Sequence, residues 1–105
     1  MICTLTARRL KPGAYDAFRA AWDPGDAPPE VIARWGQVYH VRDVTDPDVV
    51  ISFGMFDGTL DELRALQADF PREAQVDRVD PHVQEVLLDG AYEVVEQLSG
   101  ADFGA

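Results

Sequence analysis

The sequence predicts an α+β fold in which helices cover one face of an antiparallel sheet. Two apolar-rich segments, 31–41 and Val49–Phe56, flank a turn that contains three aspartates and a proline, as in a β-hairpin. A helix start follows at once, because Thr59 and Glu62 have the spacing of a capping box. The length of 105 residues, with 47% hydrophobic and 27% charged residues, fits one globular domain.

The first part of the chain predicts one strand and one helix. Ile2–Leu10 is rich in apolar and β-branched residues, which favours a strand. Segment 14–22 carries Tyr15, Phe18 and Trp22 at spacings of three and four, so these side chains share one face of an amphipathic helix. An Asp-Pro-Gly sequence ends that helix, and we expect a loop over 26–30.

The second part predicts two helices and a long final strand. Leu60, Leu63, Leu66 and Phe70 mark the apolar face of one helix, and Arg72–Val79 forms a shorter one. A strand over 83–88 then reaches an Asp-Gly pair, which suits either a hairpin turn or a bulge. The composition of segment 91–98 favours a continuation of this strand, and a helix is the alternative. We expect one domain over 1–98 and a flexible tail over 99–105.

The resulting order, β–α–β–β–α(α)–β, is the ferredoxin-like split βαβ arrangement. Val49–Phe56 and segment 83–88 are apolar on both faces, whereas a sheet with one wet face alternates cleanly. The helices can cover only one of these faces. We therefore expect a homodimer in which a second copy covers the open sheet face, because monomers rarely expose apolar patches of that size.

Net charge excludes several classes of partner. The chain carries 19 acidic and 9 basic residues, a net charge of −10, and lacks the basic stripe that nucleic acids and anionic membranes require. No apolar stretch is long enough to span a bilayer, and no leader precedes residue 10, so we expect a cytoplasmic protein. Cys3 is the single cysteine, which excludes an intrachain disulfide. We expect no metal and no cofactor.

Four residues of segment 31–41 and its end suggest chemistry. In a strand over this segment, Trp35 and Tyr39 share one face, and His40 and Arg42 share the other. The aromatic pair could stack a flat ring. His40 could act as a base, because the histidine side chain has a pKa of about 6.5 and is largely neutral at pH 7, and Arg42 could stabilise the resulting anion. The competing interpretation is structural, since Trp and Tyr commonly fill sheet–helix interfaces.

Three further residues are candidate substrate contacts: His82, Tyr92 and Trp22. His82 follows Pro81 at the start of a strand, and its spacing from His40 matches no recognised metal motif. Trp22 belongs to the aromatic stripe of the first helix. Core packing explains this stripe, but the same side chains would also cover a pocket between helix and sheet.

The chain resembles the dimeric α/β-barrel superfamily, which includes the antibiotic-biosynthesis-monooxygenase-like proteins. The resemblance lies in ICTLTARRLKPGAYDAFRAAW, in VVISFGMFDGTLDELRAL and in VQEVLLDGAYEVVEQL. It implies that two sheets stack face to face across a dimer, with the helices outside. Some members oxidise polycyclic phenols without metal or flavin, others degrade haem, and many have no known activity.

The resemblance implies a cofactor-independent monooxygenase-like enzyme that acts on an aromatic or polyketide-like small molecule. The chain contains no asparagine, whereas the haem-degrading members use an Asn, Trp and His set, so haem degradation is not expected. The alternative is a non-catalytic dimeric module that binds a small molecule or regulates a partner. These two classes differ in whether a bound ligand is turned over.

Overall fold

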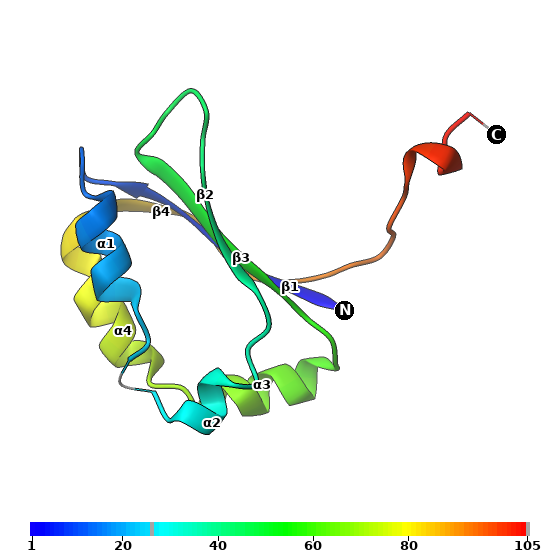
Figure 1. Ribbon diagram of the computed structural model, residues 1–105, viewed down its shortest axis with the longest axis horizontal. Helices are drawn as coiled ribbons and strands as arrows, with labels where there is room; N and C mark the ends of the chain where they lie inside the picture. Colours follow the sequence, from blue (N-terminus) through cyan, green and yellow to red (C-terminus); the bar gives the residue numbers. More distant parts are fainter. Residues whose placement is uncertain (26, 105) are drawn as a thin grey trace.

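A computed structural model describes residues 1–25 and 27–104. Its four strands form one antiparallel sheet in the order β2-β3-β1-β4, and the helices lie together on one side of it (Figure 1). The elements are β1 (Ile2–Leu10), α1 (Tyr15–Trp22), α2 (Pro29–Ile32), β2 (Val38–Arg42), β3 (Val49–Phe56), α3 (Leu60–Ala68), α4 (Arg72–Val79) and β4 (Val83–Glu93), with short 3-10 helices at Asp80–His82 and Gly100–Asp102. The predicted α+β ferredoxin-like fold is confirmed.

The pleat of the sheet assigns each side chain to one of two faces. Thr6 lies opposite Ser52 on β3, and Ser52 lies opposite His40 on β2, so these three side chains share a face. This face contacts the helices, because the His40 ring meets Phe18 of α1 edge-on at 5.7 Å between centroids. The neighbouring residues along each strand point to the opposite face.

The core lies between α1, α4 and the helix side of the sheet. Leu10, Phe18, Val50 and Val79 form its buried cluster, and Phe18 is fully buried. The aromatic stripe predicted for α1 supplies Phe18, and Tyr15 and Trp22 pack around it. Helices α1 and α4 therefore pack against one end of the sheet.

Helix α3 begins as the sequence predicts. The Glu62 amide donates to the Thr59 hydroxyl, and the Thr59 amide donates to the Glu62 carboxylate, so the capping box is complete. Leu63 and Leu66 are buried on the apolar face of this helix. Leu60 differs from the prediction, because it is half exposed.

The prediction of a strand over 31–41 is wrong for its first seven residues. Val31 and Ile32 belong to the short helix α2, and the strand begins only at Val38. Pro29 occupies the first turn of α2, where the fixed backbone angle of proline suits a helix. Gly36 consequently precedes the strand. Of the loop predicted over 26–30, residue 26 lies outside the described part of the chain.

The last strand shows whether the Asp-Gly pair forms a hairpin turn or lies within one long strand. β4 continues through Asp89 and Gly90 to Glu93, so no hairpin turn forms there. The irregularities in its pairing fall opposite the Ala7/Arg8 and Arg9/Leu10 steps of β1, away from Gly90. Segment 91–98 is a strand only as far as Glu93, and beyond it the chain leads away from the sheet (Figure 1).

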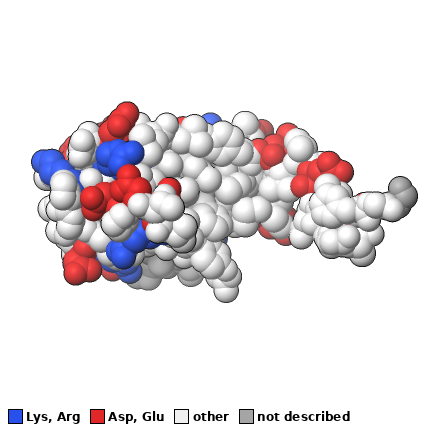
Figure 2. Space-filling view, turned by 90° about the horizontal axis from the view of Figure 1, so that it is seen from above, with Lys and Arg blue, Asp and Glu red and all other residues white. Residues whose placement is uncertain are grey.

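The sheet face opposite the helices is rich in apolar side chains. Tyr39 stacks on Phe53 across β2 and β3 on this face, with ring centroids 5.1 Å apart. Exposed neighbours on the same face include Val41, Met55, Leu88 and Tyr92. Figure 2 shows the middle of the molecule free of charged side chains, between a charged end and the acidic C-terminal part.

Candidate functional site

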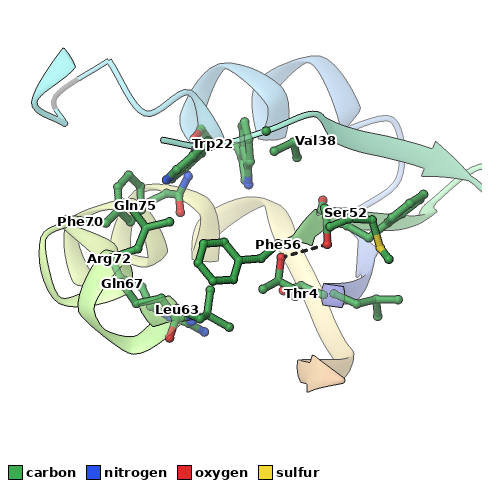
Figure 3. Close-up of a pocket in the computed structure, with 18 of the residues that line it drawn as sticks. Thr4, Trp22, Val38, Ser52, Phe56, Leu63, Gln67, Phe70, Arg72 and Gln75 are labelled. Carbon is green, nitrogen blue, oxygen red and sulfur yellow. Dashed lines mark hydrogen bonds between the residues drawn. The ribbon is translucent and has the colours of Figure 1, made fainter. Parts of the chain in front are cut away.

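A cavity of about 210 Å3 lies between the helix side of the sheet and the helices α3 and α4. Figure 3 shows Thr4, Ser52 and Val38 on the sheet side of this space, facing side chains from the helices. Its apolar lining comprises Trp22, Trp35, Val38, Phe56, Leu63, Leu66, Phe70 and Val76, and its polar lining includes Thr4, Arg8, Ser52, Gln67, Arg72 and Gln75. An apolar cavity with a few converging polar groups is the usual form of a small-molecule site.

Three aromatic rings form one wall of this cavity. The Trp35 ring packs against Phe70 at 4.8 Å and against Trp22 at 6.2 Å between centroids, and both pairs are tilted by 56°. Gln75 fixes this wall from α4, because its Nε2 atom donates to the Trp22 carbonyl oxygen at 2.6 Å. Three rings that line one cavity suit contact with a flat aromatic molecule.

A polar cluster stands on the sheet wall. The Nδ1 atom of His40 lies 2.7 Å from the Oγ atom of Ser52. The Nη1 atom of Arg8 donates to the same oxygen at 3.3 Å. Ser52 is buried and lines the cavity, so its hydroxyl links the imidazole behind it to the space in front.

The imidazole of His40 is held neutral by its surroundings. Burial lowers the pKa of His40 below its ordinary value of 6.5, and the positive charges of Arg19 and Arg8 lower it further. Trp22 meets the His40 ring edge-on at 4.5 Å between centroids. The Nε2 atom is buried and has no hydrogen-bond partner within the described residues. A neutral imidazole keeps one N–H and offers the lone pair of its other nitrogen, so His40 can accept a proton at neutral pH.

The guanidinium of Arg8 is partly buried over an aromatic ring. Its central carbon lies 5.3 Å from the centroid of Phe18, within the range of a cation–π contact. Burial lowers the pKa of the Arg8 guanidinium, but an arginine in a protein keeps its charge at neutral pH. The cluster therefore places a permanent cation beside a neutral base.

The structure separates the residues that the sequence placed together. Trp22 and Trp35 line the cavity, and His40 lies directly behind Ser52. Arg42 shares the helix side with His40, but its guanidinium lies 4.8 Å over the Tyr15 ring and does not line the cavity. The predicted shared face of Trp35 and Tyr39 is wrong, because Trp35 precedes the strand and packs on the helix side while Tyr39 stacks on the open face.

Two further candidates also lie away from the cavity. Tyr92 pairs with Cys3 and sits on the open sheet face beside Gly90. His82 belongs to the 3-10 helix before β4, and its carbonyl oxygen accepts from the Lys11 amide. The substrate-contact roles expected for Tyr39, Tyr92 and His82 stay predictions. None of these three residues lines the cavity.

Sequence reasoning missed the serine and the arginine of the cluster. Ser52 is the one polar residue in the otherwise apolar strand Val49–Phe56, which was the available signal. Arg8 lies two residues from Thr6 and two from the buried Leu10 on β1, so it shares their helix-facing side although it is charged. Within residues 1–25 and 27–104, no three His, Cys, Asp or Glu side chains gather as a metal ion would require. No helix in that part of the chain is long and apolar enough to cross a membrane.

The architecture is shared with solved structures of small oxygenase-like proteins. A candidate antibiotic biosynthesis monooxygenase from Chloroflexus aurantiacus superposes with a TM-score of 0.65 at 16% identity, over 93% of this chain and 96% of that one. One from Nitrosomonas europaea gives 0.67 at 15% identity, over 91% and 100%. The chain has the ferredoxin-like fold of the antibiotic-biosynthesis-monooxygenase-like proteins. The ferredoxin-like fold of the single chain, which the sequence resemblance implied, is thereby confirmed.

A second kind of activity occurs on the same architecture. Tetracenomycin F2 cyclase from Streptomyces glaucescens, a type II polyketide cyclase, superposes with a TM-score of 0.60 at 15% identity, over 92% of this chain and 96% of that one. No family model and no curated protein sequence matches the chain. At these identities the likeness is one of fold, and activity has to be argued from the cavity.

Proposed function

We propose that the protein is a cofactor-independent, monooxygenase-like enzyme that acts on a phenolic aromatic molecule bound in the helix–sheet cavity. The observation that carries this proposal is the polar cluster of Arg8, His40 and Ser52 on the wall of an aromatic-lined cavity. The fold shared with candidate monooxygenases and with a polyketide cyclase supports the same substrate class.

The first chemical step is removal of a proton from the bound phenol. Ser52 lines the cavity, so a phenol hydroxyl can pass its proton to the Ser52 oxygen while the serine proton moves to Nδ1 of His40. This relay uses the imidazole tautomer that carries its proton on Nε2. The resulting phenolate lies beside the Arg8 guanidinium, whose positive charge stabilises it.

The second step is oxidation of the electron-rich ring by O2. One oxygen atom is added to a ring carbon that bears hydrogen, and the other leaves as water, so that phenol and O2 yield quinone and water. The substrate supplies all four electrons that O2 accepts, and the two hydrogens of the water come from the phenol hydroxyl and the ring carbon. The protein has to bind the ring, remove the proton and exclude bulk water.

Oxygen uptake with a varied panel of electron-rich phenols tests this proposal. Replacing His40 with Ala removes the base, and the rate is expected to fall by about 100-fold or more. His82→Ala is the matched control, because His82 is the other histidine of the chain and lies outside the cavity. No turnover across the panel, or unchanged turnover in His40→Ala, would contradict an oxygenase.

A non-catalytic binding module is the second candidate function. It is favoured by the position of His40, whose ring lies behind Trp22 and Ser52 and does not itself line the cavity. Thermal-shift screening distinguishes the two classes, because a ligand that binds only the folded state raises the melting temperature. Binding without oxygen uptake or any change in the ligand would establish the binding module.

We also propose that a second copy of the chain covers the open sheet face. Tyr39, Val41, Met55, Leu88 and Tyr92 are all between 40% and 49% exposed there, although each is a large apolar or aromatic residue. A contiguous apolar surface of this kind marks an interaction site in soluble proteins. Two such faces stacked together would form a barrel with the helices and the cavities outside.

A further inference from the structure

The charged side chains around the cavity have one sign. Three arginines line it, Arg8, Arg34 and Arg72, and no aspartate or glutamate does so among the described residues. The whole chain holds only 9 basic residues against 19 acidic ones. A third of the basic residues therefore lines one cavity that no acidic side chain of the described residues lines.

Two of these arginines already have carboxylate partners. Arg34 forms an ion pair with Asp69 at 2.9 Å, and Arg72 forms one with Asp89 at 2.9 Å. Both pairs are about half exposed, so solvent screens them and their net contribution to the cavity potential is small. The third arginine is different.

Arg8 has no carboxylate partner within residues 1–25 and 27–104. Its single side-chain hydrogen bond in that part of the chain goes to the Ser52 hydroxyl. Asp89 is the main negative charge that acts on Arg8, but its two oxygens accept hydrogen bonds from the Thr6 hydroxyl at 2.9 Å and from Arg72. A guanidinium carries five N–H donors, and in the described part of the chain only one donor of Arg8, that of Nη1 to Ser52, has a hydrogen-bond partner.

We propose that Arg8 binds the carboxylate of an aromatic acid of one or two rings, whose ring occupies the aromatic end of the cavity. This inference rests on the proposed function, because it names the substrate class of the same cavity. The planar fork of a guanidinium matches a carboxylate through two parallel hydrogen bonds. The rings of Trp22, Trp35 and Phe70 supply the apolar contacts for the rest of the molecule.

The size of the cavity sets the limit on the ring system. A cavity of ~150 Å3 in another protein accepts one benzene ring. At about 210 Å3, this cavity has room for one or two fused rings. The net charge of −10 does not prevent entry of an anion, because charges farther away than about 8 Å are screened at physiological salt.

Binding of 2-naphthoate and of its neutral counterpart 2-naphthamide tests the inference. The chain has two tryptophans, Trp22 and Trp35, and both line the cavity, so their two indole N–H signals in NMR spectra report binding directly. At pH 7 the wild-type protein is expected to bind 2-naphthoate about tenfold or more tightly than 2-naphthamide, because a charge-assisted hydrogen bond is added. Arg8→Met is expected to abolish this preference, so that the two compounds bind with similar affinity.

Arg64→Met is the matched control, because Arg64 is exposed, bonds to Gln67 on α3 and does not line the cavity. It should keep the full preference for 2-naphthoate. Equal wild-type affinities for the two compounds would overturn the anion site while leaving cavity binding intact. Shifts with neither compound would overturn the proposed function together with the inference.

The Arg8 variants test whether Arg8 is the residue that binds the carboxylate. A preference that persists in Arg8→Met would overturn it. If Arg8→Met does not fold, Arg8→Lys replaces it, and loss of the planar fork is expected to weaken the preference by about threefold or more. An unchanged preference in Arg8→Lys would also overturn the assignment.

Discussion

His40 and Ser52 face each other across strands β2 and β3, and the His40 Nδ1 atom lies 2.7 Å from the Ser52 Oγ atom. This cross-strand pair joins the half-buried imidazole to the cavity. It also brings Arg8 of β1 into the same cluster, because Arg8 donates to the Ser52 oxygen. Three neighbouring strands thus contribute one residue each to the candidate site.

Ser52→Ala is expected to destabilise the protein by about 1–3 kcal/mol. The substitution removes the partner of the His40 Nδ1 atom and of Arg8, and polar groups left unpaired in a buried position are costly. Urea denaturation measures the change. The control is Ser99→Ala, which alters the other serine of the chain at an exposed position and is expected to change stability by much less.

Stability is expected to fall as the pH is lowered through His40 titration. The pKa of His40 is lower in the folded protein than its ordinary value of 6.5, mainly because of burial. Below pH 6.5 the unfolded chain therefore binds more protons than the folded one, and stability decreases until the folded pKa is passed. Melting curves of wild type and His40→Gln between pH 7.5 and 5 measure this. Parallel pH dependence of the two proteins would refute the assignment.

Phe53→Asp is expected to convert a dimer into a monomer. Phe53 stacks with Tyr39 on the open sheet face, and two buried carboxylates across an apolar interface would repel each other strongly. Light scattering at micromolar concentration gives the mass. Val44→Asp introduces the same charge at a residue that is 99% exposed in the turn between β2 and β3, and this variant should stay dimeric. A monomeric wild-type protein would contradict the interface.

Trp35→Ala is expected to weaken binding of 2-naphthamide about threefold to tenfold. Aromatic pairs contribute roughly 0.5–1.5 kcal/mol beyond the area they bury, and Trp35 contacts both other rings of the cavity wall. The Trp22 indole signal follows binding in this variant. Tyr39→Ala serves as the control, because Tyr39 lies on the opposite sheet face and its loss should leave the affinity unchanged.

The regular elements could be predicted from the sequence because their signals are local. Apolar spacing placed α1, and the Thr59–Glu62 box placed the start of α3. Segment 31–41 was harder, since short apolar runs suit strands and buried helix turns equally well. Pro29 at the first turn of α2 is the local signal that decides it.

The candidate site was predicted only in part because it depends on contacts between distant segments. His40 and Trp22 could be singled out by residue type, but their edge-on contact joins residues that are far apart in the chain. Arg8 and Ser52 are separated by 44 positions and carry no shared motif. Trp35 lines the cavity because it lies before the start of β2, outside the strand. The alternation of side chains along a strand therefore could not predict its position.

A crystal structure of the protein with 2-naphthoate tests the central claim most directly. We expect the ring to lie against Trp22, Trp35 and Phe70, with the carboxylate on the Arg8 guanidinium beside Ser52. A cavity closed by its own side chains, or a ligand bound on the open sheet face while the cavity stays empty, would contradict the account.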